Sequence, residues 1–173
     1  MDRNGILLIV RVRFRAANVL VWEGNVPLDS RAATTVIRQD FAKALGLKGK
    51  RKRIDLAIVR GERIEQPESR RVKFWISSLE NWEEFSIEVH EIKKAIFSIP
   101  PLDHKWLSSF SHLSDITFLH KAGPVDLILG VHYSHLHAED KTRQGLPFEP
   151  LAKRTKLGWL VIGSDNHKKM DHV

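Results

Sequence analysis

Short apolar runs dominate the first hundred residues, and their length and alternation are typical of β-strands. Residues 6–14 read Ile-Leu-Leu-Ile-Val-Arg-Val-Arg-Phe, an apolar run that becomes an apolar–polar alternation. A period of two places the apolar side chains on one face of a strand. Similar runs rich in β-branched and aromatic residues predict further strands at residues 19–22, 26–28, 54–59, 72–76 and 85–89.

Helical patterns are few. Phe41, Ala44 and Leu45 share one face of a helix over residues 38–46, and Gly46 is a natural residue to end it. Weaker helical patterns occur at residues 106–113 and 131–139. The chain has no internal repeat and no strand–helix–strand rhythm. It therefore predicts a mainly β, barrel-like fold with one or two short helices.

The C-terminal part predicts two buried strands and a tail. Residues 125–130 read Val-Asp-Leu-Ile-Leu-Gly, and residues 157–163 read Leu-Gly-Trp-Leu-Val-Ile-Gly. The length of 173 residues fits one domain, which we place at residues 1–163. Residues 164–173 are polar and predict a disordered tail.

Composition removes several classes of chemistry. The chain has no cysteine, which excludes disulfides, thiol catalysis and cysteine-ligated zinc. The longest apolar stretch, residues 6–10, is too short to span a bilayer, and no secretory signal is visible. We therefore expect an intracellular, cytoplasmic protein with no membrane partner and no cofactor.

The chain is basic, with a net charge of +7 and one clear charge run. The run, residues 48–53, reads Lys-Gly-Lys-Arg-Lys-Arg. A basic nucleic-acid-binding barrel is one interpretation, which predicts steeply salt-dependent binding. No aromatic residues interleave the run to stack on bases. We interpret it as a solvated loop and expect no nucleic-acid partner.

Three histidines lie close together at His132, His135 and His137. Imidazole is a good ligand for zinc. On a helix, however, only His132 and His135 share a face, and no further ligand has a firm spacing. We interpret the cluster as a solvated helix face and expect no metal site.

The strongest candidate for chemistry is Asp29-Ser30, which follows the predicted strand at residues 26–28. In aspartic peptidases two facing carboxylates share one proton, so that one acts as acid and the other as base on a water molecule. The chain has one such Asp-Ser element, so a dyad would require a symmetric dimer. The alternative is an ordinary turn or cap aspartate.

Three blocks of the sequence resemble one family. The first block consists of Val-Pro-Leu-Asp-Ser (residues 26–30) and the helix that ends in Leu-Gly-Leu (residues 45–47). This block is similar to the start of the retropepsin-like domain of BEL/Pao-type retrotransposon polyproteins. Residues 125–130 are similar to that family's Ile-Asp-Leu-Leu-Leu-Gly strand, and residues 155–163 to its Thr-Leu-Gly-Trp-Val-Leu-Ser-Gly close. The blocks span about residues 5–163.

The resemblance implies a retropepsin-like β-barrel and an aspartic endopeptidase that is active as a homodimer. Its polypeptide substrate would be the retroelement polyprotein, and it would be located in the retroelement particle. Asp29 would be the catalytic carboxylate, and Ser30, Arg31 and Ala32 would form its supporting loop. A floor strand would pack beneath that loop, comprising Leu127, Ile128, Leu129 and Gly130. A hairpin would form the flap over the substrate, comprising Val59, Arg60, Gly61, Glu62 and Arg63.

The catalytic turn departs from the family pattern at two positions. Arg31 stands where the family has glycine, and Ala32 where it has a small hydroxyl residue. Glycine there would leave room and permit unusual backbone angles, whereas an arginine places a cation that favours the ionised carboxylate. The alternative is therefore a catalytically inactive module of the same fold that dimerises or binds peptides. His132 is a second departure, where the family often has aspartate.

Overall fold

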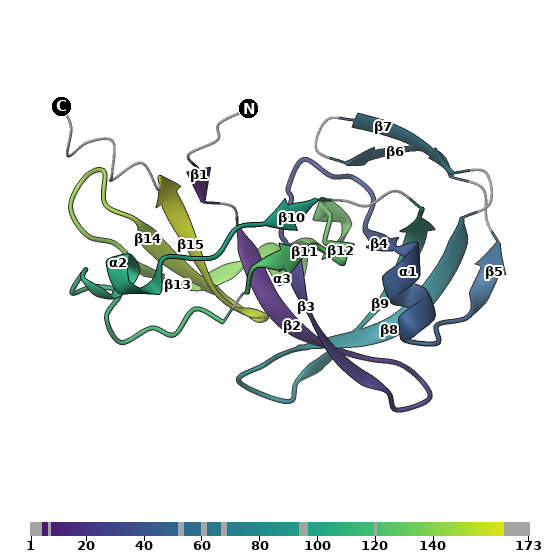
Figure 1. Ribbon diagram of the computed structural model, residues 1–173, viewed down its shortest axis with the longest axis horizontal. Coiled ribbons are helices and arrows are strands. Elements are labelled where there is room, and N and C mark those ends of the chain that lie inside the picture. The colour runs from purple at the N-terminus through teal and green to yellow at the C-terminus, as the bar shows by residue number, and fades with distance from the viewer. Residues whose placement is uncertain are drawn as a thin grey trace.

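The computed structural model describes residues 5–6, 8–51, 54–59, 62–66, 69–93, 97–119 and 121–164. A large barrel-like sheet and a four-stranded sheet lie side by side in it (Figure 1). The strands are β1 (Gly5–Ile6), β2 (Ile9–Arg15), β3 (Val21–Pro27), β4 (Val36–Arg38), β5 (Gly49–Arg51), β6 (Ile54–Val59), β7 (Glu62–Gln66), β8 (Arg70–Ser78), β9 (Glu84–Ile92), β10 (Ser98–Ile99), β11 (Gly123–Pro124), β12 (Leu127–Ile128), β13 (Glu139–Arg143), β14 (Leu151–Thr155) and β15 (Gly158–Ser164). The helical segments are α1 (Gln39–Ala44), α2 (His104–Ser108), the 3₁₀ turn η1 (Val131–Tyr133) and α3 (Ser134–His137).

The large sheet curls until its two ends meet. Its strand order is β12-β4-β9-β8-β2-β3, and β5 pairs with β8. All of its pairings are antiparallel except that between β4 and β9. Parallel bridges from Asn25 to Val125 and from Leu28 to Leu129 then join β3 to the segment that contains β12. The result is a nearly closed barrel.

The barrel core follows from the alternation in the strands. Val12 and Phe14 of β2 point inward with no exposed surface, and Arg11, Arg13 and Arg15, which alternate with them, point outward. The ring of Phe14 packs edge-on against Phe41 of α1 at 4.9 Å and lies 5.7 Å from the ring of Phe74 in β8. Burial of each such side chain contributes about 1.5–3 kcal/mol. The apolar face of α1 therefore covers one side of the barrel interior.

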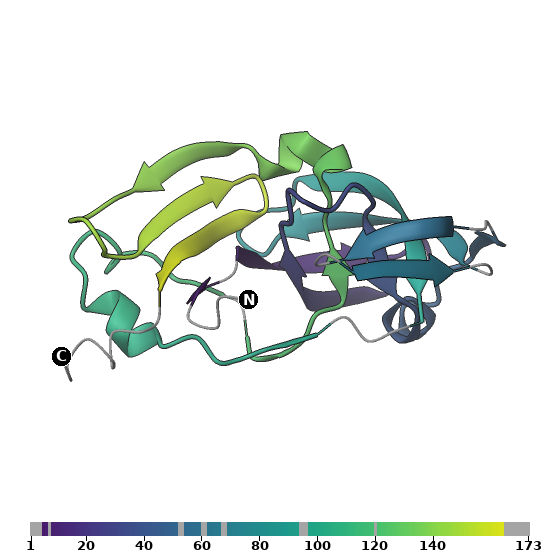
Figure 2. The same cartoon turned by 90° about the horizontal axis from the view of Figure 1, so that it is seen from above.

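The second sheet has the order β1-β15-β14-β13 and its own small core. Figure 2 shows this sheet alongside the barrel, with α2 on one of its faces. Ala152 and Val161 of the sheet pack against Leu107 of α2 and against the following segment at Leu113 and Phe118. The C-terminal block of the sequence is therefore a supporting layer.

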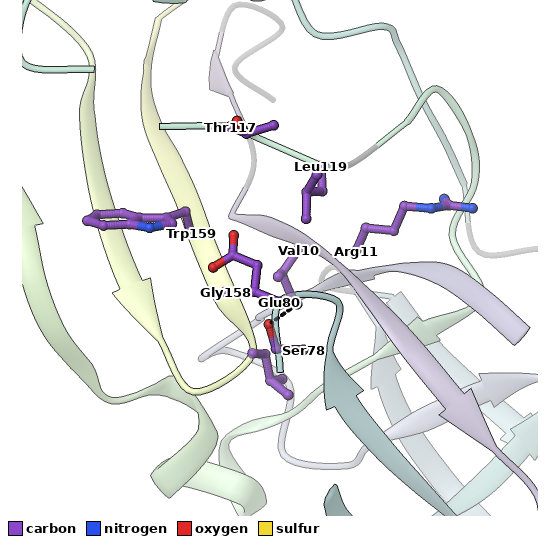
Figure 3. A pocket seen from close by; sticks show the side chains of 9 residues that line it. Val10, Arg11, Ser78, Glu80, Thr117, Leu119, Gly158 and Trp159 are labelled. Atoms are coloured by element: carbon purple, nitrogen blue, oxygen red, sulfur yellow. Dashed lines mark hydrogen bonds between the residues drawn. The ribbon is translucent and has the colours of Figure 1, made fainter. Parts of the chain in front are cut away.

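The junction between the barrel and the second sheet is tightly packed. Figure 3 shows Val10 of β2, Ser78 of β8 and Gly158 of β15 meeting there. The hydroxyl of Ser78 accepts a hydrogen bond from the backbone N–H of Glu80 at 3.1 Å. The cavity between these residues holds about 10 Å³, which is about the space of one water molecule. This part of the junction therefore leaves no room for a ligand.

The predicted mainly β, barrel-like fold is confirmed. The described residues contain three short α-helices, one more than predicted, because the patterns at residues 106–113 and 131–139 both include helical turns. The predicted tail was wrong by one residue. Ser164 is the last residue of β15 and pairs with Gly5. Residues 165–173 lie outside the described residues.

Barrel closure brings one carboxylate into the interior. Asp126, which is 7% exposed, lies between the Val125 bridge and β12. Its Oδ1 accepts a hydrogen bond from Arg38 Nη2 at 2.9 Å, and its backbone carbonyl accepts one from the Arg38 N–H. Burial raises the pKa of Asp126 by more than the bond from Arg38 lowers it.

This raised pKa predicts a pH-dependent stability. The folded protein holds the proton of Asp126 to a higher pH than the unfolded chain does. The stability contributed by this group is therefore complete below the unfolded value of about 3.9 and is lost as pH rises through the folded pKa. We expect Asp126→Asn, measured by urea unfolding from about pH 4 to 7, to lose less stability with rising pH than wild type.

Asp140→Asn is the matched control, because the pKa of Asp140 is shifted in the opposite direction. Arg154 lowers the pKa of the exposed Asp140, so this group stabilises the fold above its unfolded pKa and loses that effect as pH falls. The Asp140 contribution changes below about pH 4, so Asp140→Asn should keep the wild-type slope between pH 4 and 7. An Asp126→Asn protein with the wild-type slope would show that Asp126 has no such role.

Candidate functional site

Asp29 lies where β3 leaves the barrel sheet. Leu28 forms the last bridge of that strand, to Leu129. The Asp29 N–H donates to the carbonyl of Leu129 at 3.1 Å, and the Leu129 N–H donates to the carbonyl of Pro27 at 3.1 Å. These two backbone bonds attach the chain on either side of Leu28 to a segment one hundred residues away. Asp29 is therefore held by the barrel itself.

The Asp29 carboxylate organises the turn that follows it. Its Oδ1 accepts a hydrogen bond from the backbone N–H of Arg31 at 2.9 Å, and its backbone carbonyl accepts one from the N–H of Ala32 at 3.2 Å. This is the local bonding that aspartate supplies in a tight turn. The Asp29 side chain is 14% exposed, while Ser30 is exposed. The turn therefore presents a partly shielded carboxylate at the surface.

Arg31 fits the turn without backbone strain. Among the described residues, the non-glycine positions with positive φ are Val19 and Phe148, so Arg31 does not occupy the left-handed region. Its side chain is 82% exposed, and its Nε lies 3.6 Å from Asp29 Oδ1. Ion pairs this exposed contribute about 0–1 kcal/mol. Arg31 therefore places a movable cation beside Asp29 and does not distort the turn.

The predicted floor strand lies directly against this turn. Leu127, Ile128 and Leu129 are at most 1% exposed. The Gly130 N–H donates to Thr35 Oγ1 at 3.0 Å. A Cβ on Gly130 would lie only 2.5 Å from the carbonyl oxygen of Ala32. The close approach of the two segments therefore requires glycine at this position.

Ala32 is buried, and its role in the turn is structural. Its side chain is 1% exposed and belongs to an apolar cluster with Ile128. Its backbone carbonyl accepts a hydrogen bond from the N–H of Val131 at 2.8 Å. The turn is therefore joined to the floor segment at both of its ends, through Asp29 and through Ala32.

The predicted flap corresponds to the hairpin of β6 and β7. Val59 pairs with Glu62, and Ile58 pairs with Arg63. Arg60 and Gly61, the predicted tip, lie outside the described residues. Figures 1 and 2 both place this hairpin at the end of the barrel where the loop from β3 to β4 runs. The hairpin and the Asp29 turn therefore share one end of the molecule.

The three histidines separate into two kinds. His132 and His135 are exposed, as the predicted helix face requires. His137 is half-buried, and its Nε2 lies 3.1 Å and 3.0 Å from the carbonyl oxygens of Leu129 and Gly130. The prediction of a solvated face was therefore wrong for His137. No metal-binding group of three or more His, Cys, Asp or Glu side chains occurs in the part of the chain that the structure describes.

The basic run was predicted to be a loop, and its centre is a strand. Gly49–Arg51 form β5 and pair with β8 in the register Lys50 to Arg71. Gly49 makes this possible because a Cβ there would lie 1.9 Å from the carbonyl oxygen of Arg71. The exposed cations at Lys48 and Lys50 lie far from the Asp29 turn in the sheet order.

Three other carboxylates, those of Asp126, Asp115 and Asp140, pair with arginines. Asp126 pairs with Arg38 inside the barrel. Arg143 lowers the pKa of Asp115 through two hydrogen bonds of 3.0 Å, and Arg154 likewise lowers that of Asp140. Asp29 itself pairs with Arg31. Asp126, Asp115 and Asp140 therefore each have a cationic partner of their own and do not pair with Asp29.

Comparison with protein-family models and with curated proteins finds no match to this chain. Among the described residues, no helix combines the length and the apolar character needed to cross a membrane.

The close approach of Gly130 to Ala32 gives a testable prediction. Gly130→Ala should lower the free energy of unfolding by about 1–3 kcal/mol, because the added methyl group forces the two backbones apart. Val131→Ala is the control. Val131 is 45% exposed, so truncation there should change stability by about 0.5 kcal/mol or less. Equal effects of the two substitutions in urea unfolding would contradict this account of the site.

Proposed function

We propose that the protein is a retropepsin-like aspartic endopeptidase domain of the BEL/Pao retrotransposon type, which works as a homodimer on its polyprotein. The observation that carries the proposal is the Asp29 turn. It holds a single, partly exposed carboxylate at one end of a nearly closed barrel by backbone bonds to Leu129. The exposed Ser30 and Arg31 leave the turn accessible to a second copy.

In this proposal each copy supplies one Asp29. One carboxylate takes a proton from a water molecule, whose oxygen attacks the carbonyl carbon of the substrate peptide bond. The other, protonated carboxyl gives its proton to the carbonyl oxygen. The resulting gem-diol breaks its C–N bond. The leaving nitrogen takes the proton held by the first carboxyl, and the second carboxylate takes a proton from a hydroxyl of the gem-diol, which restores the starting state. The hairpin of β6 and β7 would cover the substrate and exclude bulk water during these steps.

A second candidate is a module of the same fold that pairs or binds peptides without cleaving them. The contact between Arg31 and Asp29 favours it, because the Arg31 guanidinium, with its Nε 3.6 Å from Asp29 Oδ1, lies against the carboxylate that the first candidate needs free. The weakness of so exposed an ion pair argues for the first candidate, since about 0–1 kcal/mol is enough to release Arg31.

The test is peptide cleavage by the wild-type protein and by variants of the turn, measured as kcat/KM over a peptide library from about pH 4 to 7. Asp29→Asn should lower kcat/KM by about a hundredfold or more, because it removes the acid–base group. Arg31→Gly should raise kcat/KM by up to about fivefold, the equivalent of one exposed ion pair.

Arg31→Ala is the matched control for the glycine variant. It removes the cation without adding glycine's conformational freedom. Because Arg31 already has an ordinary φ, both substitutions should have the same effect. Cleavage that survives Asp29→Asn would exclude the first candidate. A wild-type protein that sediments as a dimer but cleaves nothing, with both Arg31 variants also inactive, would support the second.

A further inference from the structure

The side chain of His137 points toward the floor strand beside the Asp29 turn, because contacts of Tyr133 and Leu136 fix the segment that carries it. Leu136, the preceding residue in α3, is fully buried in the barrel core. Tyr133 is tied to the edge of β9, where its hydroxyl accepts a hydrogen bond from the Glu88 N–H at 2.7 Å and donates one to the Glu88 carbonyl at 3.1 Å. These two anchors fix the segment and bring the imidazole of His137 under the floor strand.

The contacts of His137 determine where its proton lies. Nε2 is within hydrogen-bonding distance of two carbonyl oxygens, those of Leu129 and Gly130. Carbonyl oxygens accept and cannot donate, so Nε2 has to carry the hydrogen. The imidazole therefore donates one N–H to two backbone acceptors at once.

The peptide unit that joins Leu129 to Gly130 is the link to Asp29. Its carbonyl oxygen accepts from the Asp29 N–H as well as from His137. Its N–H donates to the hydroxyl of Thr35. Side chains from two distant segments therefore fix both ends of the peptide unit on which the Asp29 backbone rests.

From this geometry we infer that His137 is a positioning residue for Asp29. It holds the carbonyl of Leu129 in the orientation that receives the Asp29 N–H. The catalytic part of the inference rests on the proposed peptidase function, whereas the effect on the turn does not. Tyr133 and Leu136 hold α3 independently, so the loss of the His137 bonds should loosen the turn without unfolding the barrel.

Two polar substitutions at His137 distinguish the effect of losing the hydrogen bond from the effect of losing the volume of the ring. His137→Gln places an amide nitrogen near the position of Nε2, whereas His137→Asn is too short to place one there. Amide hydrogen exchange, resolved by NMR, reports on the N–H of Asp29 directly. We expect this N–H to exchange about three- to tenfold faster in His137→Asn and at the wild-type rate in His137→Gln.

The same pair of substitutions at the exposed His132 is the control, and neither should change exchange at Asp29. In cleavage assays His137→Asn should lower kcat by a similar factor with KM unchanged, and His137→Gln should restore it. Wild-type exchange at Asp29 in His137→Asn would overturn the inference. So would equally fast exchange in both variants, or a matching increase at the N–H of the core residue Val12, which would indicate general unfolding.

The exchange measurement keeps the two proposals apart. If the wild-type protein cleaves no peptide, the peptidase function fails, and the exchange rates still decide whether His137 positions Asp29. If the protein cleaves peptides and the exchange at Asp29 is insensitive to His137, the positioning role alone fails.

Discussion

Two backbone hydrogen bonds between the end of β3 and Leu129 hold together the end of the barrel that carries the Asp29 turn. They join the two ends of the large sheet, and they turn an open, curled sheet into a nearly closed barrel. The Asp29 turn starts at this closure, and the bond from Val131 to Ala32 attaches its far side. Since each net bond of this kind is worth only about 0.5–1.5 kcal/mol, the closure depends on the fully buried apolar side chains beneath it. These are Val26, Leu127 and Leu129.

The sequence predicted the faces of β2 well because its inward and outward positions alternate. Val12 and Phe14 are buried and the arginines that alternate with them are not, as a period of two requires. The strands predicted at residues 19–22 and 26–28 are instead one strand, β3. The sequence also predicted that the floor segment is buried, since residues 127–129 are continuously apolar. Pairing partners could not be predicted in this way. That the segment at residues 125–129 closes the barrel beside β3 depends on packing between residues one hundred positions apart, which no local pattern records.

Other features were missed because they arise only in three dimensions. His137 looks like its exposed neighbours in the sequence, and only the burial of Leu136 turns it inward. Trp82 is 78% exposed and lies under the guanidinium of Arg13 at 3.8 Å, a contact that no local pattern records. A cation above an aromatic face is favourable even at the surface. Arg31 also differed from expectation, because its backbone is unstrained and its remaining effect on Asp29 is electrostatic.

The order of these segments along the chain has a consequence for how the protein folds. The turn at Asp29 is synthesised early, but the groups that hold it arrive about a hundred residues later, with Leu129, Gly130 and His137. Closing so long a loop has a large entropic cost, and contacts of this separation form slowly. During synthesis the strands β2, β3, β8 and β9 can already pair, while the two edges that will later meet remain open. The carboxylate therefore acquires its fixed position in one of the last steps of folding. A nascent chain, or a chain truncated before Leu129, contains Asp29 but lacks the groups that hold it in place.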